Sequence, residues 1–458
     1  MTDPRPSVLD PRRFSKTLIV GLGKTGLSCA RYLRALGIPV AVVDSRRTPP
    51  GLAEACEEMP DLTLFVGGFD PDVFAAAERL IVSPGVSLRE PLIDAAVERG
   101  VPVLGDIELF AQAAQAPVAA ITGSNGKSSV TTLLGQMARL AGVKTAVGGN
   151  LGQTALDLLD DEVELYVLEL SSFQLESTSS LRARVATVLN VSADHMDRYD
   201  GLADYAATKA RIFQGAGVAV INRDDPRVRA MAGVADQDLS FGLDAPETES
   251  DVGIVDQDGE SWLARGHKPL LPAREVAAKG RHNLANALVA LAMGQACGLP
   301  EVAMLEAIRT FRGLPHRTAL VAHKGGVDWY DDSKGTNPGA TLAALDGLID
   351  PVRSERAVLI AGGDCKGADF APLVPAVERA ARAVVLIGRD APMIEGVLDG
   401  RVRILHAKDM GDAVRQAHDA AQPGDSVLLS PACASFDMFD NYEHRGRVFT
   451  AAVEGLEV

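Results

Sequence analysis

The stretch Gly123–Ser128, GSNGKS, has the residue types and spacing of a phosphate-binding loop. An apolar run, Val118–Thr122, predicts a strand before it, and a helix is predicted after it. In such a loop backbone N–H groups surround phosphates, Lys127 can reach the β- and γ-phosphate oxygens, and the Ser128 hydroxyl can bind Mg²⁺. The general pattern GxxxxGK[ST] is incomplete, because Ile121 stands where its first glycine should be. We interpret the loop as a phosphate site; the alternative is a glycine-rich turn with a solvated lysine.

A second glycine loop, Gly21-Leu-Gly23-Lys-Thr-Gly26, matches GxGxxG. It follows the predicted strand Thr17–Val20, and Asp44 ends the next strand, 21 residues after Gly23. Glycines at these positions allow a tight turn and bring a helix N-terminus close to a phosphate. Taken alone, the pattern is typical of nicotinamide or flavin binding, and a tight turn without a ligand is the alternative. The residues favour a nucleotide-type ligand and leave its identity open.

Two polar residues follow predicted strands in the same block as Lys127. Glu169 ends the strand Leu165–Glu169, and His195 lies in the loop after the strand Ala186–Asn190. Because ligands of open α/β sheets bind outside the carboxyl edge of the strands, we expect both residues in one crevice with the phosphate loop. A carboxylate there suits the metal that a nucleoside triphosphate needs. Taken singly, Glu169 could cap a helix and His195 could be a hydrogen-bonded loop residue.

The composition excludes several classes of protein. The chain has 458 residues, which suggests about three domains. Its 47% apolar and 23% charged residues exclude disorder as the main state. The net charge of −16 argues against a nucleic-acid partner, without excluding local basic pockets.

Cysteine usage and apolar runs indicate the compartment. Five scattered cysteines without CxxC spacing predict neither a disulfide framework nor a structural zinc site, and they fit a reducing compartment. No apolar run approaches the roughly 18 residues of a membrane helix, so no membrane insertion is expected. The N-terminus, MTDPRPSVLDPRRF, lacks the apolar region of a signal peptide. We therefore expect a cytoplasmic protein.

Short β-branched runs alternate with Ala- and Leu-rich stretches, which predicts an α/β fold with mostly parallel sheets. We expect an N-terminal Rossmann-like domain (1–112), a central P-loop ATPase-like domain (113–313) and a C-terminal Rossmann-like domain (314–458). The connectors are Ala111–Ala116 and Gly313–Pro315, and Leu243–Glu260 is predicted as hairpins or loops. Further predicted strands are Val40–Asp44, Leu62–Val66, Arg79–Val82, Val218–Ile221, Val327–Tyr330, Ala357–Ile360, Ala383–Ile387 and Ser426–Leu429, and the predicted helices are Leu27–Leu36, Asn283–Ala296, Leu373–Arg382 and Gly411–Ala421.

Longer motifs in all three blocks resemble those of a known family, the Mur ligases of peptidoglycan synthesis. They run in family order: TGSNGKSS, GGNLG, ELSSFQLE, DHMDRY, GRHNLANALVA, GLPHR and DDSKGTNP. GGDCKGADF, SPACASFDMF and the N-terminal GLGKTGLSC narrow the resemblance to the members that add D-glutamate. The family's shorter GxxGK[ST] loop accounts for the glycine missing at Ile121.

The resemblance implies an ATP-dependent acid–D-amino-acid ligase that joins D-glutamate to UDP-N-acetylmuramoyl-L-alanine. In the family reaction the L-alanyl carboxylate attacks the γ-phosphate of ATP, giving an acyl phosphate and ADP, and the amine of D-glutamate then attacks the activated carbonyl. Because two anions must meet, charge neutralisation and positioning are expected to provide most of the catalysis. The implied cofactors are ATP and two Mg²⁺ ions, and the chain is expected to act as a monomer.

The resemblance also assigns the first glycine loop, because the family's N-terminal domain holds the UDP part of the sugar substrate and no dinucleotide. The residues expected to bind the UDP-sugar are Gly23, Thr25, Asp44, Ser45, Arg46, Ser83, Asn150 and His195.

For ATP, the resemblance assigns Lys127 to the β- and γ-phosphates, Arg317 to the γ-phosphate and Asp332 to the ribose. Ser128 and Glu169 would hold the first Mg²⁺, and His195 the second. The implied ATP site comprises Gly123, Ser124, Asn125, Gly126, Lys127, Ser128, Ser129, Asn283, Asn286, Arg317 and Asp332, and the implied catalytic residues are Lys127, Asn150, Glu169, His195, Lys209 and Arg317.

Lys209, in the predicted helical stretch Tyr205–Phe213, matches a family lysine that CO₂ converts to a carbamate. The carbamate is an anionic oxygen ligand for Mg²⁺, whereas an ammonium would repel the ion. Its formation needs a neutral amine, which nearby metal ions favour. The alternative is a surface lysine on a helix, and only the spacing from DHMDRY argues against it. The D-glutamate contacts implied by the family are Lys334, Thr336, Lys366, Ser435 and Tyr442, the last often a phenylalanine in the family.

Other functions remain open at this stage. Within the family, the alternatives are a ligase that adds another amino acid and an enzyme similar to folylpolyglutamate synthetase, which the UDP-type domain disfavours. A nicotinamide-dependent oxidoreductase would use Gly21–Gly26 but leaves Lys127 and Glu169 unexplained. A catalytically silent homologue is disfavoured by the intact set of catalytic residues. Cys433 has no evident histidine partner, so we interpret it as a packed small residue.

Overall fold

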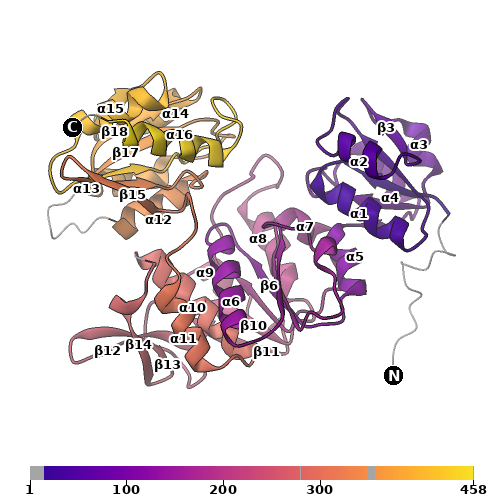
Figure 1. The fold of residues 1–458 in the computed structure, drawn as a ribbon, viewed down its shortest axis with the longest axis horizontal. Helices are drawn as coiled ribbons and strands as arrows, with labels where there is room; N and C mark the ends of the chain where they lie inside the picture. The colour runs from indigo at the N-terminus through magenta and orange to yellow at the C-terminus, as the bar shows by residue number, and fades with distance from the viewer. Residues whose placement is uncertain (1–14, 279, 349–355, 457–458) are drawn as a thin grey trace.

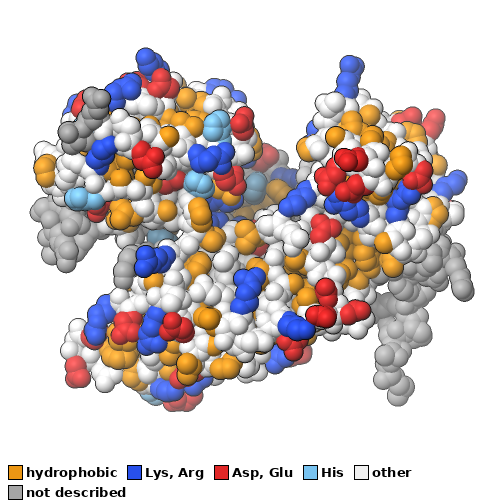
Figure 2. All heavy atoms as spheres, viewed as in Figure 1, with side chains coloured by type: hydrophobic (Ala, Val, Ile, Leu, Met, Phe, Trp, Pro, Cys, Tyr) orange, Lys and Arg blue, Asp and Glu red, His pale blue; other side chains and the backbone are white. Residues whose placement is uncertain are grey.

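The computed structural model describes residues 15–278, 280–348 and 356–456, which form three sheets with helices packed against them. Figure 1 shows the N-terminal unit in indigo and the C-terminal unit in yellow, on either side above the central unit. Figure 2 shows that the surface is hollowed between the two outer units. Within the described part of the chain, no helix is long and apolar enough to cross a membrane.

The N-terminal unit is a parallel sheet whose strand β1 leads directly into the first glycine loop. Its elements are β1 (Thr17–Val20), α1 (Lys24–Ala35), β2 (Val40–Asp44), α2 (Leu52–Glu58), β3 (Thr63–Val66), α3 (Pro71–Ala76), β4 (Arg79–Val82), α4 (Pro91–Glu98), β5 (Val103–Leu104) and α5 (Asp106–Ala113). The strand order is β3-β2-β1-β4-β5. All four residues of β1 are buried, as expected of a central parallel strand covered on both faces.

The central unit is a nine-stranded sheet of order β14-β13-β12-β11-β10-β9-β6-β8-β7, antiparallel only at β12–β13–β14. Strand β6 has β8 on one side and β9 on the other, so the loops after these three strands leave one sheet edge side by side. Its elements are β6 (Val118–Thr122), α6 (Lys127–Leu140), β7 (Thr145–Gly149), η1 (Leu156–Leu158), β8 (Leu165–Glu169), α7 (Ser172–Glu176), β9 (Val185–Val188), α8 (Leu202–Ala210), η2 (Arg211–Phe213), β10 (Val218–Asn222), α9 (Pro226–Arg229), β11 (Gln237–Phe241), β12 (Val252–Gln257), β13 (Glu260–Arg265), β14 (Lys268–Pro272), η3 (Ala273–Glu275), α10 (Arg281–Ala296) and α11 (Glu301–Thr310).

The C-terminal unit is a six-stranded sheet of order β15-β16-β20-β17-β18-β19, antiparallel only between β15 and β16. Its elements are β15 (Ala319–Lys324), β16 (Val327–Asp331), α12 (Pro338–Leu348), β17 (Ala357–Gly362), η5 (Ala371–Leu373), α13 (Val374–Ala380), β18 (Ala381–Ile387), α14 (Ala391–Leu398), β19 (Arg403–His406), α15 (Met410–Ala420), β20 (Ser426–Leu429) and α16 (Tyr442–Glu454).

The three units are joined in different ways. One apolar cluster runs from the N-terminal sheet through α5 into the central sheet, where the rings of Phe110 and Tyr166 meet edge to face at 5.0 Å. The clusters around the third sheet consist of residues from 321 onward. The first two units therefore share a core, whereas the C-terminal unit meets the central one through polar side chains described below.

Most predicted elements are confirmed, including the α/β class with three sheets and the hairpin region at Leu243–Glu260. Two predictions are wrong in part. The connector predicted at Ala111–Ala116 begins as helix, because α5 continues to Ala113. The helix predicted to end at Arg382 ends at Ala380, because the buried residues that follow pair with β17 as strand β18. The domain boundaries near residues 112 and 313 stay predictions.

Candidate active site

The phosphate-type loop lies between β6 and α6, at the carboxyl edge of the central sheet. Gly126 has φ of 88°, a left-handed conformation, and a Cβ there would lie 2.7 Å from Asn286 Oδ1. Helix α6 begins at Lys127, so its free N–H groups face the loop. The Lys127 ammonium donates to the carbonyl oxygens of Gly123 at 2.8 Å and Ser124 at 2.9 Å. Burial lowers the pKa of Lys127.

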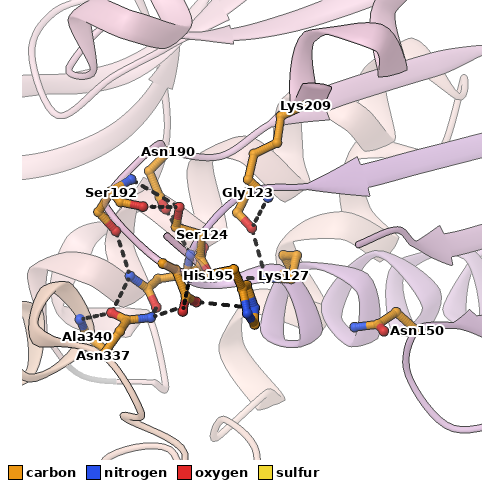
Figure 3. Close-up of polar contacts among 12 residues, drawn as sticks. Gly123, Ser124, Lys127, Asn150, Asn190, Ser192, His195, Lys209, Asn337 and Ala340 are labelled. Carbon is orange, nitrogen blue, oxygen red and sulfur yellow. Dashed lines mark hydrogen bonds and ion pairs between the residues drawn. The ribbon is translucent and has the colours of Figure 1, made fainter. Parts of the chain in front are cut away.

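Lys209 approaches the same loop from α8, and Figure 3 shows both lysines directed at Gly123. Its Nζ donates to the Gly123 carbonyl at 3.0 Å and lies 4.4 Å from the ring centre of Tyr205. The residue is 1% exposed. Burial, and then the positive charge of Lys127, holds the pKa of Lys209 well below its usual value. Lys209 is therefore a buried amine beside the loop, and the alternative of a surface lysine is wrong.

Glu169 ends β8 next to the loop and has one oxygen without a partner. Its Oε1 accepts from Asn150 Nδ2 at 2.8 Å, while Oε2 is buried and has no hydrogen-bond partner among the described residues. Glu169 is paired in register with Ile121 of β6, the strand that leads into the phosphate-type loop. A buried carboxylate oxygen left free at this strand end fits the donor chemistry of a Mg²⁺ site. No group of three His, Cys, Asp or Glu residues in the described ranges could hold a metal ion. An ion here would need phosphate or water oxygens as further ligands.

His195 lies in the loop after β9, in a left-handed conformation with φ of 56°. Its Nε2 is 3.7 Å from the carboxylate of Asp194, and its ring meets Phe173 edge to face at 4.8 Å. Burial lowers the pKa of His195, more strongly than Asp194 raises it. The neutral imidazole that results is the form that binds metals.

Two residues of the C-terminal unit reach the loop. Arg317 Nη2 donates to Ser128 Oγ at 3.0 Å. The Asn337 amide lies 3.3 Å from Asn125 Oδ1 and 3.3 Å from Asp194 Oδ2, and it also accepts from the Ala340 N–H at 2.9 Å (Figure 3). Sequence reasoning missed Asn337, because its partners lie far away along the chain.

A cavity between the central and C-terminal units, the interunit cavity, adjoins the loop. Asp332 lies buried on its wall, where burial raises the pKa of its carboxyl to about 7; Ser430 Oγ donates to it at 2.7 Å. Of the residues predicted for ATP, this cavity is lined by Asn125, Gly126, Ser129, Asn283, Asn286, Arg317 and Asp332. His282, Phe241 and Thr318 also line it and were not predicted.

A second cavity, the N-terminal cavity, lies at the carboxyl edge of the first sheet. Asp44 accepts from the Leu22 N–H at 2.7 Å, and Ser83 Oγ donates to the Gly21 carbonyl at 3.0 Å, so both side chains fix the glycine loop. It is lined by Gly23, Thr25, Asp44, Ser45, Arg46, Ser83 and Asn150 of the predicted UDP-sugar residues, and by Gln174, which was not predicted. His195 is not among the residues that line it in the described part of the chain.

The residues predicted for D-glutamate are only partly brought together. Lys334 Nζ lies 3.7 Å from the ring centre of Tyr442, and burial lowers the pKa of Lys334 to about 8. The Thr336 N–H donates to the Lys334 carbonyl at 2.9 Å. Lys366 is exposed, with its Nζ 5.9 Å from the ring centre of Phe436, and Ser435 is buried two residues after Cys433.

Comparison with models of known protein families assigns the chain to a class of ligases. Three family models match consecutive parts of the chain: the Mur ligase MurD-like N-terminal domain at 15–105, the Mur ligase middle domain at 121–294, and the Mur ligase glutamate ligase domain at 316–433. The chain belongs to the Mur ligase family.

Curated relatives are similar over nearly the full length. The UDP-N-acetylmuramoylalanine–D-glutamate ligase of Nitrosococcus oceani is 54% identical over 98% of this chain and 98% of that protein. The ligase of the same name from Pseudomonas aeruginosa is 53% identical over 96% of this chain and 98% of its own length.

Solved structures support the fold. A UDP-N-acetylmuramate-alanine ligase from Thermotoga maritima aligns with a TM-score of 0.58 at 18% identity, over 96% of this chain and 99% of that one. A pseudomurein peptide ligase type C from Methanothermus fervidus aligns with a TM-score of 0.59 at 16% identity, over 97% and 100%. At these identities the likeness concerns the architecture alone.

Proposed function

We propose that the chain is an ATP-dependent ligase that joins D-glutamate to UDP-N-acetylmuramoyl-L-alanine through an acyl phosphate, in peptidoglycan synthesis. The observation that carries the proposal is the position of Asn150. Its side chain lines the N-terminal cavity and donates to Glu169 at 2.8 Å, next to the phosphate-type loop. A sugar nucleotide held in the N-terminal cavity would therefore extend its acyl end toward the γ-phosphate.

Binding and charge neutralisation of ATP rest on the loop and the C-terminal unit. Lys127 and the N-terminus of α6 would hold the β- and γ-phosphates, and Arg317 would steady the γ-phosphate. Asp332 would accept from the ribose hydroxyls, with Asn283 and Asn286 beside the adenine. Glu169 Oε2 and Ser128 Oγ would hold one Mg²⁺ and His195 a second; when bound, the ions neutralise phosphate and carboxylate charge. These roles suit a reaction in which an anion attacks an anion.

The second half of the reaction depends on the C-terminal unit. Lys334 and Lys366 would pair with the two carboxylates of D-glutamate, with Thr336, Ser435 and Tyr442 around it. The amine would then attack the acyl carbonyl and release phosphate. Because water would compete for the acyl phosphate, approach of the C-terminal unit over the loop would protect the intermediate. We include a cytoplasmic location and action as a monomer in the proposal.

The deciding experiment measures phosphate release from ATP in the presence of UDP-N-acetylmuramoyl-L-alanine, with D-glutamate, L-glutamate or no amino acid. We expect release only with D-glutamate, and a loss of at least about a hundredfold in Lys127→Ala. Lys144→Ala, at an exposed lysine, is the matched control. Phosphate release that requires another amino acid would support the ligase reaction and exclude D-glutamate as its substrate. No turnover with any amino acid would favour a silent homologue.

A further inference from the structure

Two cysteines of the C-terminal unit face each other in the interior. Cys365 and Cys433 are 3% and 1% exposed, and their sulfur atoms lie 2.8 Å apart although 68 residues separate them in the chain. Sequence analysis gave them no partner. Nothing in the reaction proposed above uses either thiol, so their close approach requires its own explanation.

The backbone around the pair has the geometry of a cross-strand cysteine site. Asp364 and Ala434 form an antiparallel bridge and exchange both hydrogen bonds, at 3.0 and 2.9 Å. Cys365 and Cys433 are therefore the next opposed pair, in the non-hydrogen-bonded position, where Cα atoms lie about 4.5 Å apart and side chains come closest. Disulfides span Cα separations of about 4.4–6.8 Å, so the backbone is already within range.

Both sides of the pair are held in place. The Cys365 N–H donates to Asp390 Oδ2 at 2.9 Å, and Arg445 Nη1 donates to the Cys433 carbonyl at 3.1 Å. Lys366 and Ala432, which flank the pair on the two segments, both have left-handed φ angles, 48° and 58°. Such strain in non-glycine residues persists only where surrounding structure fixes the backbone. The thiols are therefore presented to each other by a fixed frame.

We propose that Cys365 and Cys433 are an oxidation site: a small peroxide converts them to a disulfide that ties the segment carrying Lys366 to the segment carrying Ser435. The effect on D-glutamate rests on the proposed function, whereas the disulfide itself does not. Lys366 directly follows one cysteine, and Ser435 lies two residues after the other. The disulfide joins the two segments covalently, so Lys366 and Ser435 no longer adjust independently when D-glutamate binds.

The chemistry balances with hydrogen peroxide as oxidant. The sulfur of one cysteine attacks the O–O bond and becomes a sulfenic acid, and the other oxygen leaves as water after taking the thiol proton. The second sulfur attacks the sulfenic sulfur, the S–O bond breaks, and a second water leaves with the remaining thiol proton. Two thiols are oxidised and one peroxide is reduced to two waters. The neighbouring thiol and burial raise the pKa of Cys433, so oxidation is slow at neutral pH and accelerates at alkaline pH.

Peptide mapping tests the site without any turnover assay. The full chain is treated with hydrogen peroxide at neutral and mildly alkaline pH, blocked with an alkylating agent and digested with trypsin. We expect a linked pair of peptides, Ala357–Lys366 and Gln416–Arg445, that separates on reduction. Cys56→Ser, at an exposed cysteine, is the control and should still form the link. If the two thiols remain alkylatable while other cysteines oxidise, the proposal is overturned.

Kinetics test the consequence. We expect oxidation to raise the KM for D-glutamate roughly tenfold, leave the KM for ATP unchanged, and reverse with dithiothreitol. In Cys365→Ala, or in Cys433→Ala if the first variant folds poorly, the peroxide effect on this KM should vanish. If the linked peptides form but the KM for D-glutamate is unchanged, the disulfide does not act on the D-glutamate residues. If the link forms and the reduced protein does not use D-glutamate, the proposed function fails and the oxidation site stands.

Discussion

Arg198 donates a hydrogen bond of 2.8 Å to the carbonyl oxygen of Val86, and so joins the loop that carries His195 to the turn beside the N-terminal cavity. The same guanidinium donates to the Pro84 carbonyl at 3.0 Å and lies 4.1 Å from the ring centre of Phe173. Phe173 in turn contacts the His195 ring. One side chain thus connects the walls of the predicted sugar-nucleotide site and the candidate metal site.

We predict that Arg198→Met raises the KM for the sugar nucleotide by on the order of tenfold, because two hydrogen bonds from a charged donor are lost. Arg198→Lys should recover only part of the affinity, since an ammonium cannot reproduce the two-pronged contact. The measurement is initial-rate kinetics with each substrate varied, supported by calorimetric binding of UDP-N-acetylmuramoyl-L-alanine.

The matched control is Arg89→Ala. Arg89 also crosses between the first two units, pairing with Asp200 at 2.7 Å, but both side chains are exposed, at 57% and 77%. An exposed ion pair contributes little to stability, so the KM values of Arg89→Ala should stay near those of the original chain. Equal effects of the two arginine variants would show that the units are joined by charge alone and would remove the positioning role of Arg198.

The sequence predicts best what depends on local chemistry. Continuous apolar runs such as Thr17–Val20 and Val118–Thr122 are central parallel strands with the predicted bounds, because burial on both faces removes polar residues from them. The edge strand β3 was predicted, but other edge strands were missed. Strand β19 (Arg403–His406) is only partly buried and has exposed polar residues at both ends, so its pattern does not differ from that of a loop.

Long-range contacts set the limit for the site. The glycine-loop pattern and the strand ends predicted Lys127 and Glu169, the resemblance added Lys209, and the structure brings the three residues around one loop. Sequence reasoning did not predict the contact of Asn337 with Asn125, 212 residues away, or that of Cys365 with Cys433. The first contact depends on how two units pack together and the second on which strands of one sheet pair, and hydrophobic periodicity encodes neither.

The close approach of α12 to the phosphate-type loop gives a second prediction. A Cβ at Gly339 would lie 2.9 Å from Ser192 Oγ and 3.2 Å from Ser192 Cβ, so in Gly339→Ala either Ser192 or α12 must give way by a few tenths of an ångström. We expect kcat to fall roughly tenfold, because the reacting groups lose alignment, with thermal stability maintained. Stopped-flow turnover and calorimetry measure the two effects.

Gly396→Ala is the control for this substitution. Gly396 lies in helix α14 of the same unit, and a Cβ there would meet no atom within 4 Å. It should leave kcat unchanged and stabilise the helix by up to about 1 kcal/mol. If Gly339→Ala keeps full kcat, the approach of α12 to Ser192 has no part in turnover.

Asp332 gives a prediction on pH. Burial raises the pKa of its carboxyl to about 7, above the value near 3.9 of an unfolded chain. The folded chain thus holds a proton that the unfolded chain has lost, so this contribution to stability is present at low pH and is lost as pH rises toward 7. Asp332→Asn should remove that slope, about 1.4 kcal/mol per pH unit. Urea unfolding of both proteins across this range measures the difference.

The same residue should couple pH to ATP binding, because only the ionised carboxylate accepts from both ribose hydroxyls. Affinity for ATP should therefore weaken as pH falls below about 7 in the original chain, and be lower and flat in Asp332→Asn. Asp106→Asn is the control, since burial raises the pKa of Asp106 to about 6, away from the interunit cavity. It should alter the stability profile and leave ATP affinity unchanged. If ATP affinity depends on pH in the same way in Asp332→Asn and Asp106→Asn, Asp332 does not bind the ribose.

Lys209 is the residue at which burial has the most direct chemical consequence. Its depressed pKa supplies the neutral amine that CO₂ requires, and rotation of the side chain away from the Gly123 carbonyl would free the nitrogen to react. We predict that ¹³CO₂ labels Lys209 and leaves the exposed Lys144 unlabelled, as seen by ¹³C NMR of the intact chain. Lys209→Ala should lose at least about a hundredfold in kcat and regain part of it with short carboxylic acids, which restore an anionic oxygen. Lys209→Arg keeps the positive charge but cannot form the carbamate, so it should be as inactive as Lys209→Ala; full activity in this variant would show that a cation, and no carbamate, is what the loop requires.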